Sequence, residues 1–163
     1  MNADSLSQHP AVLTGPGAPF PPLLQFGLTF ALGVLIDASL RELAAPSLWP
    51  GAPGGVLIVA GSLLFASGMW TFARARTGIL LQRPAARVVT HGPYRWTRNP
   101  MYLGCVLIYV GAALVFNSIV AFLLLPLVIV LVTLTVIRRE ERYMTRQFGE
   151  AYLDYCRRVR RWI

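Results

Sequence analysis

Four apolar segments constrain the fold of this chain more than any other feature. They cover about residues 23–43, 55–72, 101–116 and 119–137, and together with shorter apolar stretches they make 55% of the 163 residues hydrophobic. As helices rising 1.5 Å per residue, segments of this length cross most or all of a ~30 Å bilayer core. Lipid offers no partners for unpaired backbone amides, which favours helices. The sequence therefore predicts an all-α integral membrane fold with four transmembrane helices.

The distribution of charge orients these helices. All fifteen basic residues are arginines, the formal net charge is +8, and most arginines lie in the segments 73–100 and 138–163. Arginines beside apolar spans are the pattern of the positive-inside rule, so we expect a cytoplasmic connector, a cytoplasmic tail and both termini in the cytoplasm. The same charge makes nucleic-acid binding a poor second interpretation, and the lipid bilayer is the expected partner.

The chain divides into a short tail and one membrane domain. Residues 1–22 are rich in Pro, Gly, Ser and Ala and predict a flexible N-terminal tail, and 23–163 form the domain. Residues 138–163 predict a partly amphipathic cytoplasmic helix that Gly149 bends or interrupts. No pair or cluster of cysteine and histidine has the spacing of metal ligands, so no metal site is expected.

Two local patterns predict how the helices pack. Gly54, Gly61 and Gly68 recur every seven residues, which gives one smooth stripe for close helix contact. Asn117 and Ser118 leave room only for a tight turn between the third and fourth apolar segments. The fourth helix must therefore return antiparallel beside the third.

The segment from Thr90 to Gly104 reads T-H-G-P-Y-R-W-T-R-N-P-M-Y-L-G. Pro93 and Pro100 each fix φ near −65° and push the preceding residue toward extended geometry. The segment therefore predicts a shaped, non-helical loop that starts a transmembrane helix at Met101. A plain positive-inside loop with interfacial aromatic residues is the alternative, but such an anchor does not need two prolines.

The tight turn also brings acidic residues back to this loop. Glu140 and Glu141 follow the fourth apolar segment, so they are expected beside Arg98, Asn99 and Tyr102 at the cytoplasmic end of the bundle. The alternative is ordinary pairing with neighbouring arginines in a solvated helical turn. Carboxylates, arginines, an amide and aromatic rings at one rim have the composition of a binding site.

S-adenosyl-L-methionine fits this composition. Its sulfonium and ammonium groups suit Glu140 or Glu141, its carboxylate suits an arginine, and its adenine suits tyrosine and proline. No glycine-rich turn follows a predicted strand, so a Rossmann-type methyltransferase is excluded. The expected reaction is methyl transfer to a lipophilic acceptor. We expect Arg98 and Glu141 to be its catalytic residues, which orient polar groups near the reacting centre.

Three blocks resemble one family of membrane enzymes. They are G-P-Y-R-W-T-R-N-P-M-Y-L-G at Gly92–Gly104, E-E at Glu140–Glu141, and F-G-E-A-Y-L-D-Y at Phe148–Tyr155. In order and spacing they are similar to the isoprenylcysteine carboxyl methyltransferase and phospholipid methyltransferase family of bacterial-type membrane enzymes. The resemblance implies a protein of a bacterial inner membrane that uses S-adenosyl-L-methionine on an isoprenylcysteine carboxylate-like or phospholipid amine-like acceptor.

By this resemblance, the cofactor contacts fall on Val88, Val89, Tyr94, Asn99, Pro100, Met101, Tyr102, Glu140 and Glu141. Two positions depart from the family pattern. Many members have histidine where Asn99 stands, and an amide hydrogen-bonds but does not titrate. Eukaryotic prenylcysteine enzymes have a substrate-binding arginine where this chain has Val136, which argues against assuming a prenylcysteine carboxylate.

Two other functions compete with methyl transfer. A membrane reductase of the sterol-reductase type would bind NADPH at a similar polar end of a helical bundle. The 2′-phosphate of NADPH prefers arginines and is repelled by paired glutamates, so Glu140 and Glu141 favour the methyl donor. The second alternative is a non-catalytic membrane scaffold.

Overall fold

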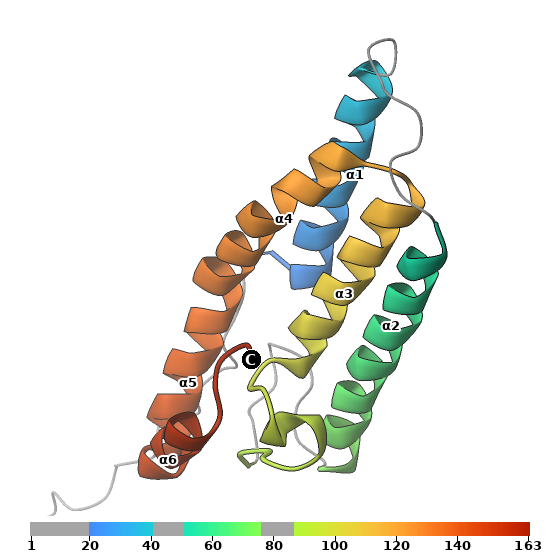
Figure 1. Ribbon diagram of the computed structural model, residues 1–163. Helices are drawn as coiled ribbons and strands as arrows, with labels where there is room; N and C mark the ends of the chain where they lie inside the picture. The colour runs from blue at the N-terminus through green and yellow to red at the C-terminus, as the bar shows by residue number, and fades with distance from the viewer. Residues whose placement is uncertain (1–19, 41–50, 76–86) are drawn as a thin grey trace, which may run out of the picture.

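The computed structural model describes residues 20–40, 51–75 and 87–163, and within these ranges the chain forms helices and no strand. Four helices run alternately up and down in Figure 1, and their bounds are α1 (Pro22–Leu40), α2 (Gly51–Arg74), α3 (Pro100–Val115) and α4 (Ile119–Val132). Helix α3 contacts α1, α2 and α4, so it is the central helix of the bundle. The predicted all-α fold is confirmed for the described residues.

Helix α4 does not end at the predicted membrane boundary. It continues through a π-helical turn, η3 (Thr133–Ile137), into α5 (Arg138–Phe148), which makes one helix of 30 residues. Its apolar part ends at Ile137. The next segment, α5, contains six charged residues. This helix, α1 and the part of α2 from Pro53 are long and apolar enough to cross a membrane, whereas α3 is a shorter apolar helix.

Two helices differ in extent from the prediction, and the predicted interruption at Gly149 is confirmed. The second helix begins at Gly51 rather than residue 55, because Pro53 falls in its first turn, where a missing amide donor breaks no hydrogen bond. The tail 138–163 is not one helix. Gly149 adopts φ 51° between α5 and α6 (Glu150–Arg158), and the chain beyond α6 is non-helical. The N-terminal tail, apart from residues 20–22, lies outside the described residues.

The glycine stripe of α2 is a direct contact with α3. A Cβ added at Gly61 would lie 2.6 Å from the carbonyl oxygen of Gly104, and one added at Gly54 would lie 2.6 Å from that of Gly111. The relationship is reciprocal, since a Cβ at Gly104 would lie 2.7 Å from the oxygen of Gly61. The two backbones touch with no side chain between them, as the seven-residue spacing predicted.

The turn between α3 and α4 is as tight as predicted. Asn117 has φ 52°, and Ser118 is the N-cap of α4, where its hydroxyl accepts a hydrogen bond from the amide of Ala121. Asp37 near the end of α1 accepts hydrogen bonds from the Ser118 hydroxyl and, at 3.2 Å, from the amide of Val120. The carboxylate therefore links α1 to the positive N-terminal end of α4.

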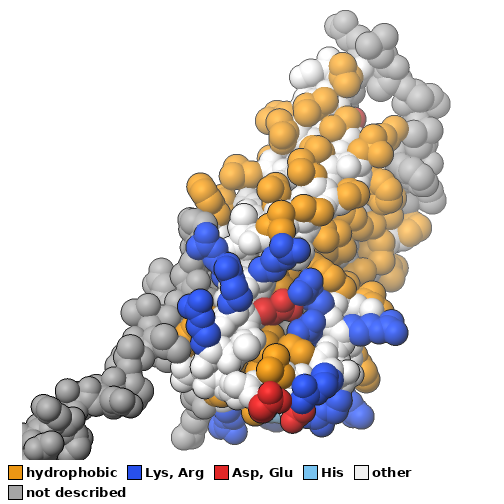
Figure 2. Space-filling model, turned by 90° about the vertical axis from the view of Figure 1, so that its left-hand side faces the viewer, with side chains coloured by type: hydrophobic (Ala, Val, Ile, Leu, Met, Phe, Trp, Pro, Cys, Tyr) orange, Lys and Arg blue, Asp and Glu red, His pale blue; other side chains and the backbone are white. Residues whose placement is uncertain are grey.

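The outer surface of the bundle changes character along its length. Large apolar side chains are exposed on α1, α2 and α4, among them Leu28, Leu35, Val56, Leu63, Leu123 and Leu127. Figure 2 shows apolar side chains over the upper part of one face and arginines gathered over its lower part. This division is typical of a helical bundle that presents an apolar belt to lipid and a charged end to water.

Candidate functional site

The rigid loop before α3 contains a short helical turn. Residues Gly92–Arg95 form a 3₁₀ helix, η2, and α3 then begins at Pro100, so the prediction of an entirely non-helical loop was wrong. Pro93 and Pro100 each occupy the first turn of their helix, where proline is pre-organised. Gly92 adopts φ 61°, and a Cβ there would lie 2.9 Å from the hydroxyl oxygen of Thr71. The loop is thus held against the end of α2.

Tyr102 and Glu140 meet at the polar end of the bundle. The Tyr102 hydroxyl donates a 2.8 Å hydrogen bond to Oε1 of Glu140. Tyr102 lies in the first turn of α3 and Glu140 in the first turn of α5, so the tight turn after α3 does return the acid to this rim. This contact was predicted from the turn, and it links two of the predicted cofactor-binding residues.

Burial of Glu140 changes its acidity. The apolar part of its helix ends at Ile137, so Glu140 lies beyond the membrane-spanning part. Burial raises the pKa of its carboxyl from 4.5 to about 7, the nearby charge of Glu141 adds to the rise, and the Tyr102 hydrogen bond opposes it. Near neutral pH a cation that binds beside this carboxyl would therefore favour its charged form.

Glu141 has different partners from Glu140. Arg161 donates from Nε to Oε1 at 2.9 Å and from Nη2 to Oε2 at 2.7 Å, and Nη1 of Arg98 lies 3.3 Å from Oε1. This is a two-point arginine–carboxylate pair, the strongest common form of ion pair. It raises the pKa of Arg161 above its ordinary value. Among the residues described, the ion pairs of Glu141 are thus with Arg98 and Arg161, which lie outside α5.

Asn99 does not face the glutamates. Its side-chain amide donates a 2.9 Å hydrogen bond to the backbone carbonyl of Arg161, which also accepts from the Thr97 hydroxyl at 3.2 Å. The amide of Arg98 donates to the carbonyl of Arg160 at 2.9 Å. Residues 159–163, which we call the C-terminal segment, therefore lie along the start of α3, and Trp162 packs against the apolar core.

The remaining predicted residues lie around this rim. Tyr94 is buried, its backbone oxygen accepts a 2.7 Å hydrogen bond from Tyr155, and its hydroxyl has no partner among the described residues. Burial raises the pKa of Tyr94, and the neighbouring Tyr155 and Glu140 contribute. Pro100 is fully buried, and Met101 and Pro100 pack against the glycine at position 68. Tyr94, Pro100 and Met101 therefore all pack at the polar end of the bundle.

Val88 and Val89 are placed differently from each other. Val89 is buried in a small cluster with Tyr94 and Ala75, whereas Val88 packs against the cluster of Tyr152, Tyr155 and Val159. Figure 1 shows residues 87–99, which precede α3, at the same end of the molecule as α6. Both valines therefore lie at the polar end, Val89 in the cluster of Tyr94 and Val88 against the cluster of α6.

Sequence reasoning missed two partners of the site. Arg161 lies twenty residues beyond Glu141, on the far side of a helix break, and no local pattern connects the two. Cys156 accepts a 2.6 Å hydrogen bond from Nη1 of Arg98. The only sequence signal for Arg161 was its place in an arginine-rich tail, and it shares that signal with seven other arginines.

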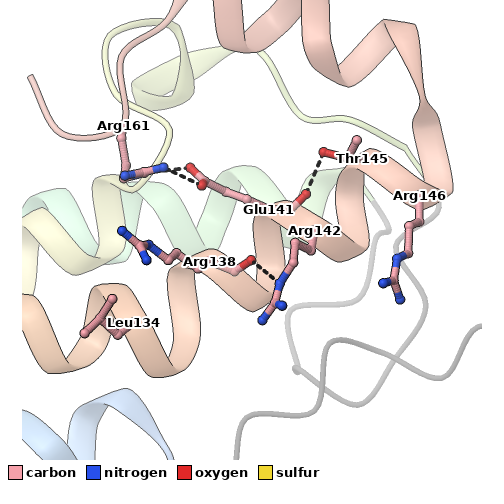
Figure 3. Close-up of a pocket in the computed structure, with 7 residues that line it drawn as sticks. All are labelled: Leu134, Arg138, Glu141, Arg142, Thr145, Arg146 and Arg161. Atoms are coloured by element: carbon pink, nitrogen blue, oxygen red, sulfur yellow. Dashed lines mark hydrogen bonds and ion pairs between the residues drawn. The ribbon is translucent and has the colours of Figure 1, made fainter.

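A cavity of about 770 Å³ opens on a second face of α5. Its lining residues, drawn in Figure 3, include Glu141, Arg161 and three arginines of α5. Glu140 does not line it and instead contacts Tyr102. The two adjacent glutamates thus serve different surfaces, as expected for neighbouring residues about 100° apart on a helix.

The fold and site define a class: a bundle of long apolar helices with a buried tyrosine–carboxylate pair and an arginine–carboxylate cluster at one end. Comparison with known proteins agrees with this class. Residues 50–151 match the family model described as phospholipid methyltransferase. This match covers more than half of the chain, and the chain belongs to the phospholipid methyltransferase family.

Individual relatives are methyltransferases by name. The chain is 29% identical over 153 residues to mouse protein-S-isoprenylcysteine O-methyltransferase, covering 84% of this chain and 52% of that protein. It is 26% identical over 140 residues to Arabidopsis thaliana protein-S-isoprenylcysteine O-methyltransferase B (80% and 71%). It is 33% identical over 128 residues to Emericella nidulans phosphatidyl-N-methylethanolamine N-methyltransferase (71% and 61%). The chain thus spans about half the length of the mouse relative.

Proposed function

We propose that this protein is an S-adenosyl-L-methionine-dependent membrane methyltransferase that acts on a lipophilic acceptor. The observation that carries the proposal is the contact between Tyr102 and Glu140, which joins the two separate parts of the family resemblance at one rim. The named relatives methylate an isoprenylcysteine or a phospholipid amine. These names favour methyl transfer over the reductase and scaffold alternatives.

The residues present fit the cofactor. Glu140 is a half-buried carboxylate whose pKa is raised to about 7, and the Tyr94 hydroxyl is a buried polar atom without a partner among the described residues. A ligand with a positive charge and several polar groups would satisfy both. We assign Glu140, Tyr102 and Tyr94 to cofactor binding, with Met101 and Pro100 packing against it and Val89 supporting Tyr94.

When bound, S-adenosyl-L-methionine supplies an electrophilic methyl group. The chain's own contribution is to bind, orient and exclude water. Glu140 would face the positive charge, and its partial burial, which raises its pKa, favours a site with little water. Arg98 is held by Glu141, Cys156 and the backbone of Arg160, so its guanidinium is a fixed positive charge beside the rim. We propose that Arg98 and Glu141 orient the acceptor's polar group.

The acceptor's apolar part has a groove to enter. A cavity of about 240 Å³ lies between α1 and α3, and its lining is apolar: Leu23, Phe26, Gly27, Phe30, Cys105, Ile108, Tyr109 and Ala112. Cys105 follows Tyr102 by three residues, which is about 4.5 Å along the axis of α3. An aliphatic chain in this groove would therefore place its polar end near Tyr102. We propose that the acceptor reaches the site sideways from the bilayer along this groove.

One residue, Val136, bears on the chemical class of the acceptor's reacting group. Val136, which stands where the eukaryotic prenylcysteine enzymes have arginine, is fully buried in the apolar core. It offers no charge to a prenylcysteine carboxylate. This observation favours a phospholipid amine-like acceptor over an isoprenylcysteine carboxylate-like one.

The topology we propose has four transmembrane helices, α1 to α4, with the connector, α5, α6 and both termini in the cytoplasm of a bacterial cell. The arginines of α5 and α6 support this orientation. Single cysteines at Arg158 and at Ser39, near opposite ends of the bundle, test it in a background without the native cysteines. A membrane-impermeant thiol reagent added to intact cells should label only the Ser39→Cys protein, and the reverse labelling would contradict the orientation.

Labelled methyl transfer tests the activity. Purified protein is incubated with membrane lipid extract and S-adenosyl-L-methionine that carries an isotopically labelled methyl group, and mass spectrometry identifies any labelled lipid. A labelled product that disappears with Glu140→Gln would support the proposal. A protein that binds NADPH but not S-adenosyl-L-methionine, judged by protection against thermal unfolding, would overturn it.

Gly27→Leu tests the groove, because nothing lies within 4 Å of a Cβ there and the new side chain has room to enter it.

A further inference from the structure

The large cavity on α5 is not explained by the proposed methyl transfer. Its volume is about 770 Å³, and Figure 3 shows its lining. We call it the arginine pocket, and its lining residues are Leu134, Arg138, Glu141, Arg142, Thr145, Arg146 and Arg161. It takes residues from η3, from α5 and from the C-terminal segment.

Three of its arginines form one row. Arg138, Arg142 and Arg146 stand four residues apart on α5, so they share one face of the helix. The Arg142 side chain donates from Nε to the carbonyl of Arg138 at 3.2 Å, which holds its guanidinium along the row (Figure 3). Like charges at this spacing repel one another, so a row of this kind is less costly when an anion lies among them.

The row has no carboxylate partner among the residues that the structure describes. Glu141 is the only acidic residue that lines the pocket, and Arg161 and Arg98 already take its two oxygens. By contrast, Arg157 on α6 pairs with both Asp154 and Glu150. The arginine pocket therefore carries an excess of positive charge that the described part of the chain does not neutralise.

The pocket also sits at a boundary in polarity. Leu134 lies one helical turn before Arg138 and is 46% exposed, so the apolar surface of the long helix runs directly into the row of arginines. In a bilayer this boundary is the level of the lipid headgroups, where phosphate attracts arginine. A ligand that contacts both Leu134 and the arginines needs an apolar part beside an anionic one.

We propose that the arginine pocket binds the phosphate of an anionic phospholipid from the adjacent leaflet. Arg138, Arg142 and Arg146 donate to the phosphate oxygens, and Leu134 contacts the glycerol and upper acyl chain. Arg161 stays on Glu141. Glu141 borders both this pocket and the proposed reaction site, but Glu140 and Tyr102 do not line the pocket. The lipid bound by the arginine row is therefore distinct from the methyl acceptor, and the inference does not depend on the proposed reaction.

Native mass spectrometry of the full chain in detergent tests this site. The probes are phosphatidylglycerol and phosphatidylcholine with the same acyl chains. The test variant is Arg138→Gln, Arg142→Gln and Arg146→Gln combined. The matched control, which changes the same amount of charge on α6 and beyond it, is Arg157→Gln, Arg158→Gln and Arg160→Gln.

We expect the unmodified chain to retain phosphatidylglycerol and not phosphatidylcholine. The test variant should bind phosphatidylglycerol roughly 100-fold more weakly, at about a factor of five for each arginine, and the control should change less than twofold. Equal loss in both variants would show general attraction to positive charge and overturn the site. So would displacement of the lipid by millimolar inorganic phosphate, which would identify a free anion as the ligand.

A second variant guards against misfolding. Arg142→Glu reverses one exposed charge at the middle of the row and should weaken phosphatidylglycerol binding by roughly tenfold or more. Its thermal unfolding without lipid should match that of the unmodified chain. Unchanged phosphatidylglycerol binding in this variant would also overturn the proposal. Labelled methyl transfer to detergent-solubilised membrane lipid extract, which supplies the acceptor, should remain in both variants, which separates failure of this site from failure of the proposed reaction.

Discussion

Helix α3 is held in two different ways along its length. Along α2, contact is between backbones, since an added Cβ at Gly54, Gly61 or Gly104 would lie 2.6 to 2.7 Å from a carbonyl oxygen of the other helix. At its start, α3 is held by long polar side chains and by the C-terminal segment, through contacts such as Asn99 to the Arg161 carbonyl. Along α2, the helices pack closely because glycine has no side chain. At the start of α3, polar side chains make the contacts.

This difference predicts different consequences of mutation. In the glycine contact there is no space for another atom, so a small addition must separate two helices. At the polar end each hydrogen bond contributes only about 0.5–1.5 kcal/mol, or more where a charge takes part, but each also orients a neighbour. Changes in the glycine contact should therefore act on folding, and changes at the polar end should act mainly on binding and turnover.

The largest effect is expected at Gly61. Gly61→Ala places a Cβ 2.6 Å from a backbone oxygen that cannot move alone, and we expect a loss of about 3 kcal/mol in unfolding free energy. Gly55→Ala is the matched control on the same helix, because nothing lies within 4 Å of its Cβ and alanine favours helix by about 1 kcal/mol. Unfolding in mixed detergent micelles measures both. Equal stability of the two variants would contradict the proposal that the backbone contact at Gly61 leaves no space for a side chain.

The glycine contact could be predicted from sequence because it depends only on residue size and spacing. Gly54, Gly61 and Gly68 appear at a constant interval, and small residues at such an interval indicate a helix contact whatever the partner is. The antiparallel return of α4 beside α3 followed from the tight turn at Asn117 in the same way. Both are local patterns, and the structure confirmed both.

The polar end could be predicted only in part. The turn brought Glu140 to Tyr102 as expected, because helix length and direction decide that contact. The pairing of Glu141 with Arg161 depends on the break at Gly149 and on where the C-terminal segment then runs. No periodicity in the sequence determines that path. Nor did the sequence indicate that the side chain of Asn99, a predicted cofactor contact, also holds the C-terminal segment.

The second prediction concerns cofactor affinity. Glu140→Gln keeps the shape of the side chain but removes its negative charge, and we expect S-adenosyl-L-methionine to bind roughly 10- to 100-fold more weakly. Tyr102→Phe removes the hydroxyl that orients Glu140 and should cost roughly fivefold. Asp154→Asn is the control, since it removes the same charge from an exposed position on α6. Calorimetry measures all three, and unchanged affinity in both site variants would contradict the assignment of the rim.

The third prediction is a dependence on pH. The pKa of Glu140 is raised to about 7, so at pH 6 most of this carboxyl is protonated and at pH 8 most is charged. If the charged form binds the cofactor's cation, affinity should rise roughly tenfold from pH 6 to pH 8 and then level off. Binding at pH 6 should release a proton. Calorimetry in two buffers that differ in ionisation enthalpy detects this release.

Folding stability should respond to pH in the opposite direction. A carboxyl whose pKa is higher in the folded state than its ordinary 4.5 favours folding when protonated. Its contribution is complete below about pH 4.5 and is lost as the pH rises to about 7. Glu140→Gln should flatten both profiles. A binding profile that keeps its slope in this variant would assign the titration to another group.

The smallest effect is expected at the C-terminal segment. Arg161→Gln leaves the segment in place through its backbone but frees Glu141, so we expect turnover to fall by roughly three- to tenfold with little change in KM for the cofactor. Arg157→Gln removes an exposed arginine–carboxylate pair and should leave turnover unchanged. Asn99→Ala loosens the same segment by a second route.

If Asn99 and Arg161 act through one segment, the double variant should lose less activity than the product of the two single losses. Independent losses that multiply would mean that the two residues contribute separately to the site. In that case the C-terminal segment would support the fold, as the glycine contact does, and would not act by positioning Glu141. Rescue of turnover in Arg161→Lys would point the same way, because lysine supplies the charge without the two-point geometry.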